Sequence, residues 1–111
     1  MKLDIGRVIT NFEGKAIKDS FGISEDKIQK DLTLGGACIN SLLYIQDEKP
    51  ISGQEKLDRY ELALKIKVAL GTDKKEADLK IEEIAKIKEL VGKFYNTLVV
   101  GQVFKLIEEK N

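Results

Sequence analysis

One helix, predicted over residues 52 to 70, constrains the fold of this chain more than any other stretch. At about 100° per residue, the sequence SGQEKLDRYELALKIKVAL carries apolar side chains on three sides, and its one unbroken polar stripe is Asp58, Glu61 and Lys65. A helix that is apolar nearly all round is normally buried among several others. We therefore expect this helix to be the buried centre of the fold, with Ser52 and Glu55 forming a capping box at its start.

The rest of the chain predicts a single α+β domain, mostly α, over residues 1 to 111. A length of 111 residues and a hydrophobic content of 42% suit one compact domain. We expect an N-terminal β-hairpin that turns at Gly14, then a variable connection with one helical turn begun by Ser24, then a small bundle of about four helices. These three parts cover residues 1–17, 18–31 and 32–111. The expected helices are 34–45 after Thr33 as N-cap, 52–70, 80–95, and 98–109 after Thr97 as N-cap.

The charge balance excludes several classes of partner. The 19 basic and 19 acidic residues cancel, and neither half of the chain has a long run of one sign, so we expect no nucleic-acid partner and no anionic membrane surface. Apolar runs fall well short of the roughly 20 residues that span a bilayer, and the N-terminal residues do not form a signal-peptide core. The sequence therefore predicts a cytoplasmic protein.

Two scarce residue types restrict the available chemistry. The chain has no histidine and a single cysteine, Cys38, which removes the commonest zinc frameworks and the histidine-dependent nucleophile systems. Cys38 falls on the apolar face of the helix at 34–45, where a free cysteine usually acts as a small hydrophobe. We expect a protein that is not an enzyme, with no catalytic residues, no metal site and no cofactor.

The start of the helix at 34–45 allows two interpretations. Gly35 and Gly36 follow Thr33 and Leu34, and each glycine costs about 1 kcal/mol of helix propensity relative to alanine. One compensation is the close packing of another backbone against the glycines. The other is an anion bound by the free amides of the helix start, with Thr33, Gly35 and Gly36 as its binding residues.

Surplus apolar surface predicts a protein interface. The helix at 52–70 and the last helix carry more apolar side chains than a chain this short covers easily, and exposed apolar patches tend to become interfaces. Arg59 and Lys67 fall among apolar neighbours, and an inter-helix corner gathers aromatic and amide side chains. We expect a partner, either a second copy in a homo-oligomer or another protein, to bind Arg59, Tyr60, Lys67, Tyr95, Gln102 and Phe104.

Several short segments, in order along the chain, resemble a family of small, largely uncharacterised proteins of tailed bacteriophages. They include Asn11-Phe12-Glu13-Gly14-Lys15, Ile39-Asn40-Ser41-Leu42-Leu43, Ser52-Gly53-Gln54-Glu55-Lys56, Val91-Gly92-Lys93 and Leu98-Val99-Val100-Gly101-Gln102. The resemblance implies a viral protein in the host cytoplasm and transfers no catalytic residues. By analogy with small phage proteins, an inhibitor of a host or defence protein is the function we favour, and a virion-assembly accessory protein is an alternative. A further alternative is an oligomeric sponge that binds a small anionic ligand, such as a signalling nucleotide.

Overall fold

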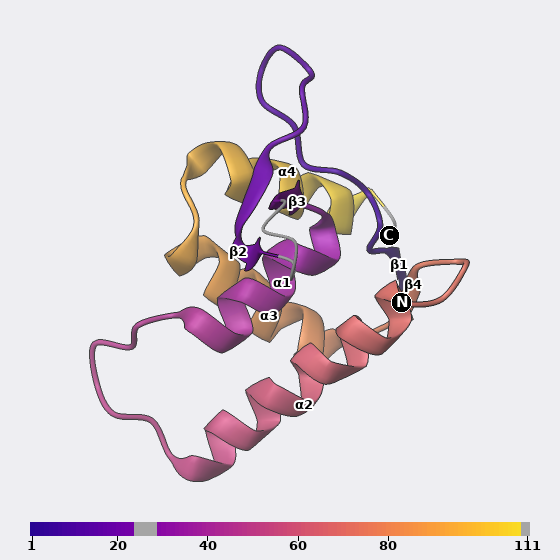
Figure 1. The fold of residues 1–111 in the computed structure, drawn as a ribbon. Coiled ribbons are helices and arrows are strands. Elements are labelled where there is room, and N and C mark those ends of the chain that lie inside the picture. The colour runs from indigo at the N-terminus through magenta and orange to yellow at the C-terminus, as the bar shows by residue number, and fades with distance from the viewer. Residues whose placement is uncertain (24–28, 110–111) are drawn as a thin grey trace.

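The fold is α+β and mostly helical, as the sequence predicts. A computed structural model describes residues 1–23 and 29–109, in which four helices and two small antiparallel sheets lie (Figure 1). Each helix in these residues is too short or too polar to cross a membrane. In chain order the elements are β1 (Lys2–Asp4), β2 (Lys18–Ile23), β3 (Gln29–Asp31), α1 (Leu34–Tyr44), α2 (Gly53–Leu70), β4 (Glu76–Asp78), α3 (Ile81–Phe94) and α4 (Thr97–Glu108).

The central helix is α1. Thr33 caps it as predicted, because the Thr33 hydroxyl accepts a hydrogen bond from the Gly36 amide at 3.0 Å. α1 contacts α2, α3, α4 and β2, and seven of its residues are buried. Six of these seven, Leu34, Gly35, Ala37, Cys38, Ser41 and Leu42, are small or apolar and let the surrounding helices approach closely.

The helix predicted to be the centre, α2, lies instead at the rim of the molecule (Figure 1). Its buried side faces α1 and β4, whereas its opposite side is 46 to 65% exposed. The buried residues are Arg59, Leu62, Ala63 and Ile66, and the exposed apolar ones are Leu57, Tyr60, Leu64 and Val68. The prediction of a buried central helix was wrong, because periodicity shows that several sides are apolar without showing which side is covered.

Of the capping box predicted at the start of α2, the Ser52 bond is present and the Glu55 bond is not. The Ser52 hydroxyl accepts a hydrogen bond from the Glu55 amide at 3.0 Å. The Glu55 carboxylate does not return to the helix start as a capping box requires. It binds Arg59 and Lys86 instead, at 2.8 and 2.7 Å, because two cations outcompete one backbone amide.

The N-terminal hairpin is present around Gly14, whose φ is 83°. The Asn11 amide donates to the Lys15 carbonyl, and the Ile17 amide donates to the Ile9 carbonyl. The chain before it pairs elsewhere: β1 lies antiparallel to β4, with Leu3 opposite Ala77 and both buried. This pairing joins residues more than 70 positions apart, which local sequence patterns do not reveal.

The connection at 18–31 contains more structure than predicted. β2 and β3 pair antiparallel, with Lys18 opposite Asp31, and the Leu32 amide donates to the Ile17 carbonyl. The helical turn predicted at Ser24 lies outside the described residues. The described strands place Asp19 and Phe21 beside α1, so this part of the chain contributes to the surface described next.

The last two helices complete the core. The buried side of α3 is Ile84, Ile87, Leu90 and Val91. α4 begins one residue earlier than predicted, because the Asn96 side chain, and not Thr97, accepts from the Val99 amide at 3.1 Å. Both side chains can cap a helix, so their order in the sequence does not decide between them.

Candidate functional site

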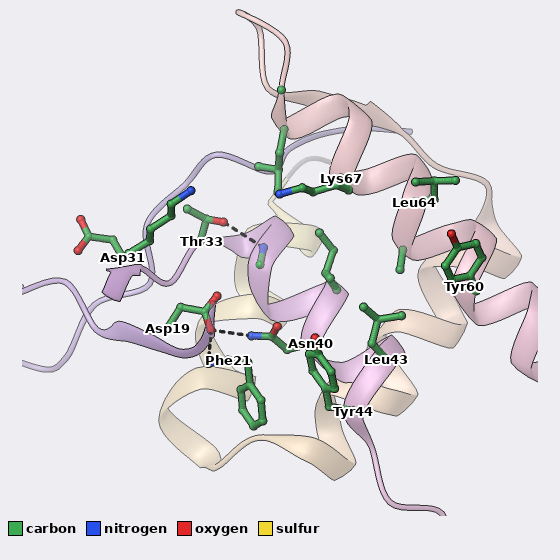
Figure 2. A pocket seen from close by; sticks show the side chains of 16 residues that line it. Asp19, Phe21, Asp31, Thr33, Asn40, Leu43, Tyr44, Tyr60, Leu64 and Lys67 are labelled. Atoms are coloured by element: carbon green, nitrogen blue, oxygen red, sulfur yellow. Dashed lines mark hydrogen bonds between the residues drawn. The ribbon is translucent and has the colours of Figure 1, made fainter. Parts of the chain in front are cut away.

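A groove of about 730 Å³ runs between α1 and α2 (Figure 2). Apolar side chains of both helices line it, and polar residues of β2 and β3 stand at its edge. We call it the α1–α2 groove. Its lining includes Ile39, Asn40, Leu43 and Tyr44 from α1, Tyr60, Ala63, Leu64, Lys67 and Leu70 from α2, and Asp19, Phe21 and Asp31 from β2 and β3.

The apolar lining of the groove is accessible to solvent. Phe21, Leu43, Tyr44, Tyr60 and Leu64 are each between 43 and 56% exposed. Large apolar side chains occur singly on any protein surface, but a contiguous set in a concave site is typical of a binding surface. The groove therefore presents solvent-exposed apolar area that a partner can bury.

The exposed side of α2 extends this apolar surface beyond the groove. Tyr60 and Leu64 belong to both the groove and a line of residues spaced three or four apart on one side of the helix. We call this line the α2 stripe, and it consists of Leu57, Tyr60, Leu64 and Val68. It lies opposite the buried residue Ile66, so α2 is apolar on both its inner and its outer side.

An aromatic cluster supports one end of the groove. Phe21 stacks on Tyr44 with ring centroids 5.3 Å apart, and it also contacts Phe94 at 5.2 Å. Phe94 in turn meets Tyr95 edge-on at 4.9 Å. These contacts tie β2, α1 and α3 together, so the aromatic wall of the groove is held by three elements.

A partly buried hydrogen-bond network, centred on Asn40, lies behind the polar edge. Asn40, which is 5% exposed, donates to Asp19 at 3.0 Å and to the Tyr95 hydroxyl at 2.9 Å. Burial raises the pKa of Tyr95 to about 12, so the phenol stays neutral at physiological pH. Tyr95 was predicted to bind a partner, but it does not line the groove, and its hydroxyl accepts the hydrogen bond from Asn40.

Charged side chains of both signs line the groove: Asp19, Lys30 and Asp31 on the side of β2 and β3, and Lys67 on α2. Lys67 projects from α2, and within the described residues it has no ion-pair partner (Figure 2). Asp31 on β3 forms an exposed ion pair with Lys18 at 2.6 Å. A partner therefore meets apolar walls beside charged side chains of both signs.

Arg59, predicted to contact a partner, is instead part of the interior. It is 8% exposed, and its guanidinium binds Asp47 at 3.0 Å and Glu55 at 2.8 Å. These bonds fasten the loop before α2 to the helix, and Lys86 joins them through Glu55 at 2.7 Å. Its position among apolar neighbours reflects a paired, buried charge and not an interface.

Gln102 and Phe104 lie on α4, away from the groove. The Gln102 amide oxygen accepts from the Thr10 amide at 2.9 Å, and its nitrogen donates to the Thr10 carbonyl. Phe104 is half-buried, and Lys88 lies 4.8 Å from the centre of its ring. Of the six residues predicted to bind a partner, the structure brings only Tyr60 and Lys67 to the groove.

The glycines at the start of α1 serve packing. The amides that an anion would need donate within the protein: Leu34 to the Arg7 carbonyl, Gly35 to the Ile5 carbonyl, Gly36 to the Thr33 hydroxyl and Ala37 to the Thr33 carbonyl. A Cβ on Gly35 would lie 3.0 Å from Leu70 and 3.1 Å from the Ile5 carbonyl oxygen. The anion site predicted at Thr33, Gly35 and Gly36 is thus not formed, because its donors are already used.

The other reactive side chains lie outside the groove, in the core or in a second cleft. Burial raises the pKa of the Cys38 thiol to about 12, so it remains a neutral core side chain. A second cleft, of about 370 Å³, carries Asp58 and Glu61 near Lys65, which pairs with Glu83 at 3.0 Å. In residues 1–23 and 29–109, no group of three or more acidic or cysteine side chains is placed to hold a metal ion.

Sequence reasoning missed the α1 and β2 walls of the groove. Phe21 falls in the stretch predicted to be a connection, and Leu43 resembles any core residue of an apolar helix face. Asn40 and Tyr44 gave a usable signal, because they are four apart and therefore share one side of the helix.

Comparisons with profiles of known protein families, with curated proteins and with solved structures found no match to this chain.

Proposed function

We propose that this protein is a non-enzymatic binding protein that acts through protein–protein contacts at the α1–α2 groove. The observation that carries the proposal is the gathering of large, solvent-accessible apolar side chains from two helices and a strand around one concave surface. Large apolar and aromatic residues supply contact area, so this lining favours binding of a partner.

The α2 stripe, which shares Tyr60 and Leu64 with the groove, extends the surface that supports this proposal. A rim helix normally turns a polar face to water, yet α2 exposes Leu57, Tyr60, Leu64 and Val68 there. A partner that covers the groove and this stripe together would bury apolar area from both. Lys67, which lines the groove and has no ion pair among the described residues, gives the partner a charged anchor.

The resemblance to proteins of tailed bacteriophages suggests the partner class. We infer a viral protein that works in the host cytoplasm and inhibits a host or defence protein by occupying its surface. A virion-assembly role uses the same groove and differs only in the partner, which would then be a phage structural protein.

Photo-crosslinking from the groove tests this proposal. Tyr60 is replaced by p-benzoylphenylalanine, which keeps an aromatic ring at a position 56% exposed, and the protein is irradiated in bacterial cells. We expect a discrete crosslinked product whose partner mass spectrometry identifies. The product should disappear when Leu43→Gln and Leu64→Gln are added, because these changes remove apolar area from both walls.

The matched control places the same photoreactive residue at Ile81, which is 83% exposed at the start of α3 and outside the groove. We expect no equivalent product there. Identical products from both positions, or none from Tyr60, would contradict binding at the groove.

A further inference from the structure

We propose that the turn at residues 11–15 of one copy docks into the α1–α2 groove of a second copy. We call this segment the Phe12 turn. The inference rests on the proposed function, since it names an occupant for the same groove. It commits to a contact between two copies of this chain.

The Phe12 turn presents a single apolar side chain to solvent. Phe12 is 97% exposed, which is the largest value among the exposed large apolar residues of the described chain. A phenyl ring in contact with water lacks the hydrophobic stabilisation that burial provides. Nothing in the described part of the fold packs on this ring, so only contact with another molecule can bury it.

The turn holds Phe12 in a fixed conformation. The Asn11 side-chain oxygen accepts from the amides of Glu13 at 2.9 Å and Lys15 at 3.0 Å. Two backbone bonds between Asn11 and the residues that follow it close the loop, and Gly14 takes the required positive φ. A preorganised turn loses less conformational entropy when it docks than a flexible loop does.

Gln102 anchors the base of the same turn to the body of the protein. Its side chain bonds both the amide and the carbonyl of Thr10, directly before Asn11. Gln102 is therefore a positioning residue for the Phe12 turn.

The turn and the groove are complementary in apolarity, and Glu13 and Lys67 supply one pair of opposite charges. The turn also carries Lys15, and the groove also carries Asp19, Lys30 and Asp31. Phe12 matches a concave surface walled by Leu43, Tyr44, Tyr60 and Leu64, whose volume of about 730 Å³ exceeds that of a phenyl side chain. Glu13, next to Phe12, has no ion-pair partner in residues 1–23 and 29–109, and neither has Lys67 at the groove. Opposite charges of this kind orient a docking segment.

The positions of the two surfaces define the assembly. The hairpin that carries the Phe12 turn projects at one end of the molecule, and α2, which forms one wall of the groove, lies at the other (Figure 1). A contact between them joins copies head to tail, which produces a ring or an open chain depending on the rotation between copies.

Complementary variants test the contact by sedimentation velocity. Phe12→Ala removes the docking side chain and keeps the groove, whereas Leu43→Gln with Leu64→Gln damages the groove and keeps the turn. We expect the wild type to self-associate as its concentration rises, and each variant alone to associate about 10- to 100-fold more weakly. Their mixture should form a one-to-one dimer, because only one productive turn and one productive groove then meet.

One control variant and one control measurement make the result specific. Ile81→Ser removes an apolar residue that is 83% exposed and lies outside the groove, and it should leave self-association unchanged. Far-UV circular dichroism of each variant should match the wild type, since all the substituted side chains are substantially exposed.

Three outcomes overturn the inference. They are a monomeric wild type at all concentrations, unchanged self-association of Phe12→Ala, and a mixture that does not dimerise. If groove substitutions weaken association while Phe12→Ala does not, the Phe12 turn is the wrong occupant and the groove remains the binding surface. If groove substitutions leave both self-association and the Tyr60 crosslink intact, the proposed function fails as well.

Discussion

Glu55 is the residue at which three segments of the chain meet. Its carboxylate accepts from Lys86 on α3 at 2.7 Å and from Arg59 on its own helix at 2.8 Å, and Arg59 also binds Asp47 in the preceding loop. The hydrogen bond from Lys86 is the largest influence that lowers the pKa of Glu55 below its ordinary value of 4.5. The charged carboxylate is thus favoured in the folded protein relative to the unfolded chain.

This shift predicts a pH-dependent contribution to stability. A carboxyl group with a depressed folded pKa stabilises the protein fully above its unfolded pKa, and the contribution is lost as the pH falls through the folded value. Lys86→Met removes the largest cause of the shift. We expect it to lower the free energy of unfolding at neutral pH and to approach the wild type in acid, below pH 4.5, as measured by urea titration.

Lys93→Met is the control for this measurement. Lys93 pairs with Glu89 at 3.3 Å, but both side chains are 64% exposed, so the pair contributes little at any pH. If Lys86→Met lowers the free energy of unfolding equally at neutral and acid pH, its effect comes from packing and not from the charge of Glu55.

Among the elements, α1 depends on the close approach of its first turn to the N-terminal segment. Gly35→Ala would place a Cβ 3.1 Å from the Ile5 carbonyl oxygen, and this backbone atom cannot move aside easily. We expect a loss of about 1 to 3 kcal/mol in the free energy of unfolding, measured by chemical denaturation.

Gly101→Ala on α4 gives the contrasting case. A Cβ there meets nothing within 4 Å, so alanine should stabilise the helix by about 0.5 to 1 kcal/mol through its better propensity. Equal effects of the two substitutions would contradict the packing role assigned to Gly35.

A pair of substitutions in α2 tests the position of this helix at the rim. Ile66 is fully buried and Leu64 is 48% exposed, although both are apolar residues of the same helix. We expect Ile66→Ala to cost about 2 to 5 kcal/mol of unfolding free energy and Leu64→Ala less than about 1 kcal/mol. Similar costs would mean that α2 is buried on both sides, as its sequence alone suggests.

These elements also show how far local sequence determines the fold. Thr33 and Ser52 could be recognised as helix caps because capping involves residues only three positions apart. The pairing of β1 with β4 could not, since it joins opposite ends of a long stretch of chain and has no local signature. The side of α2 that is covered depends on where α1 lies, which is a property of the tertiary structure.

At the scale of the whole molecule, the candidate site exists because the fold brings together residues of separate segments of the chain. Tyr60 and Lys67 could be predicted because their own helix marks them as unusual, but Leu43 and Phe21 become site residues only when α1 and β2 come to lie beside α2. Arg59 carried the same signal as Lys67 and proved to be an internal ion-pair partner, since sequence does not show where Asp47 lies.

A dilution series of ¹H–¹⁵N correlation spectra tests the central claim most directly, because it reports which surface of the protein makes contact. As the wild type is concentrated, we predict shift changes in two separate places: residues 11–15, and the α1 and α2 residues that line the groove. The same series on Phe12→Ala should lose both sets together. Spectra that do not change with concentration, or changes centred on α3 and α4, would contradict docking of the Phe12 turn in the α1–α2 groove.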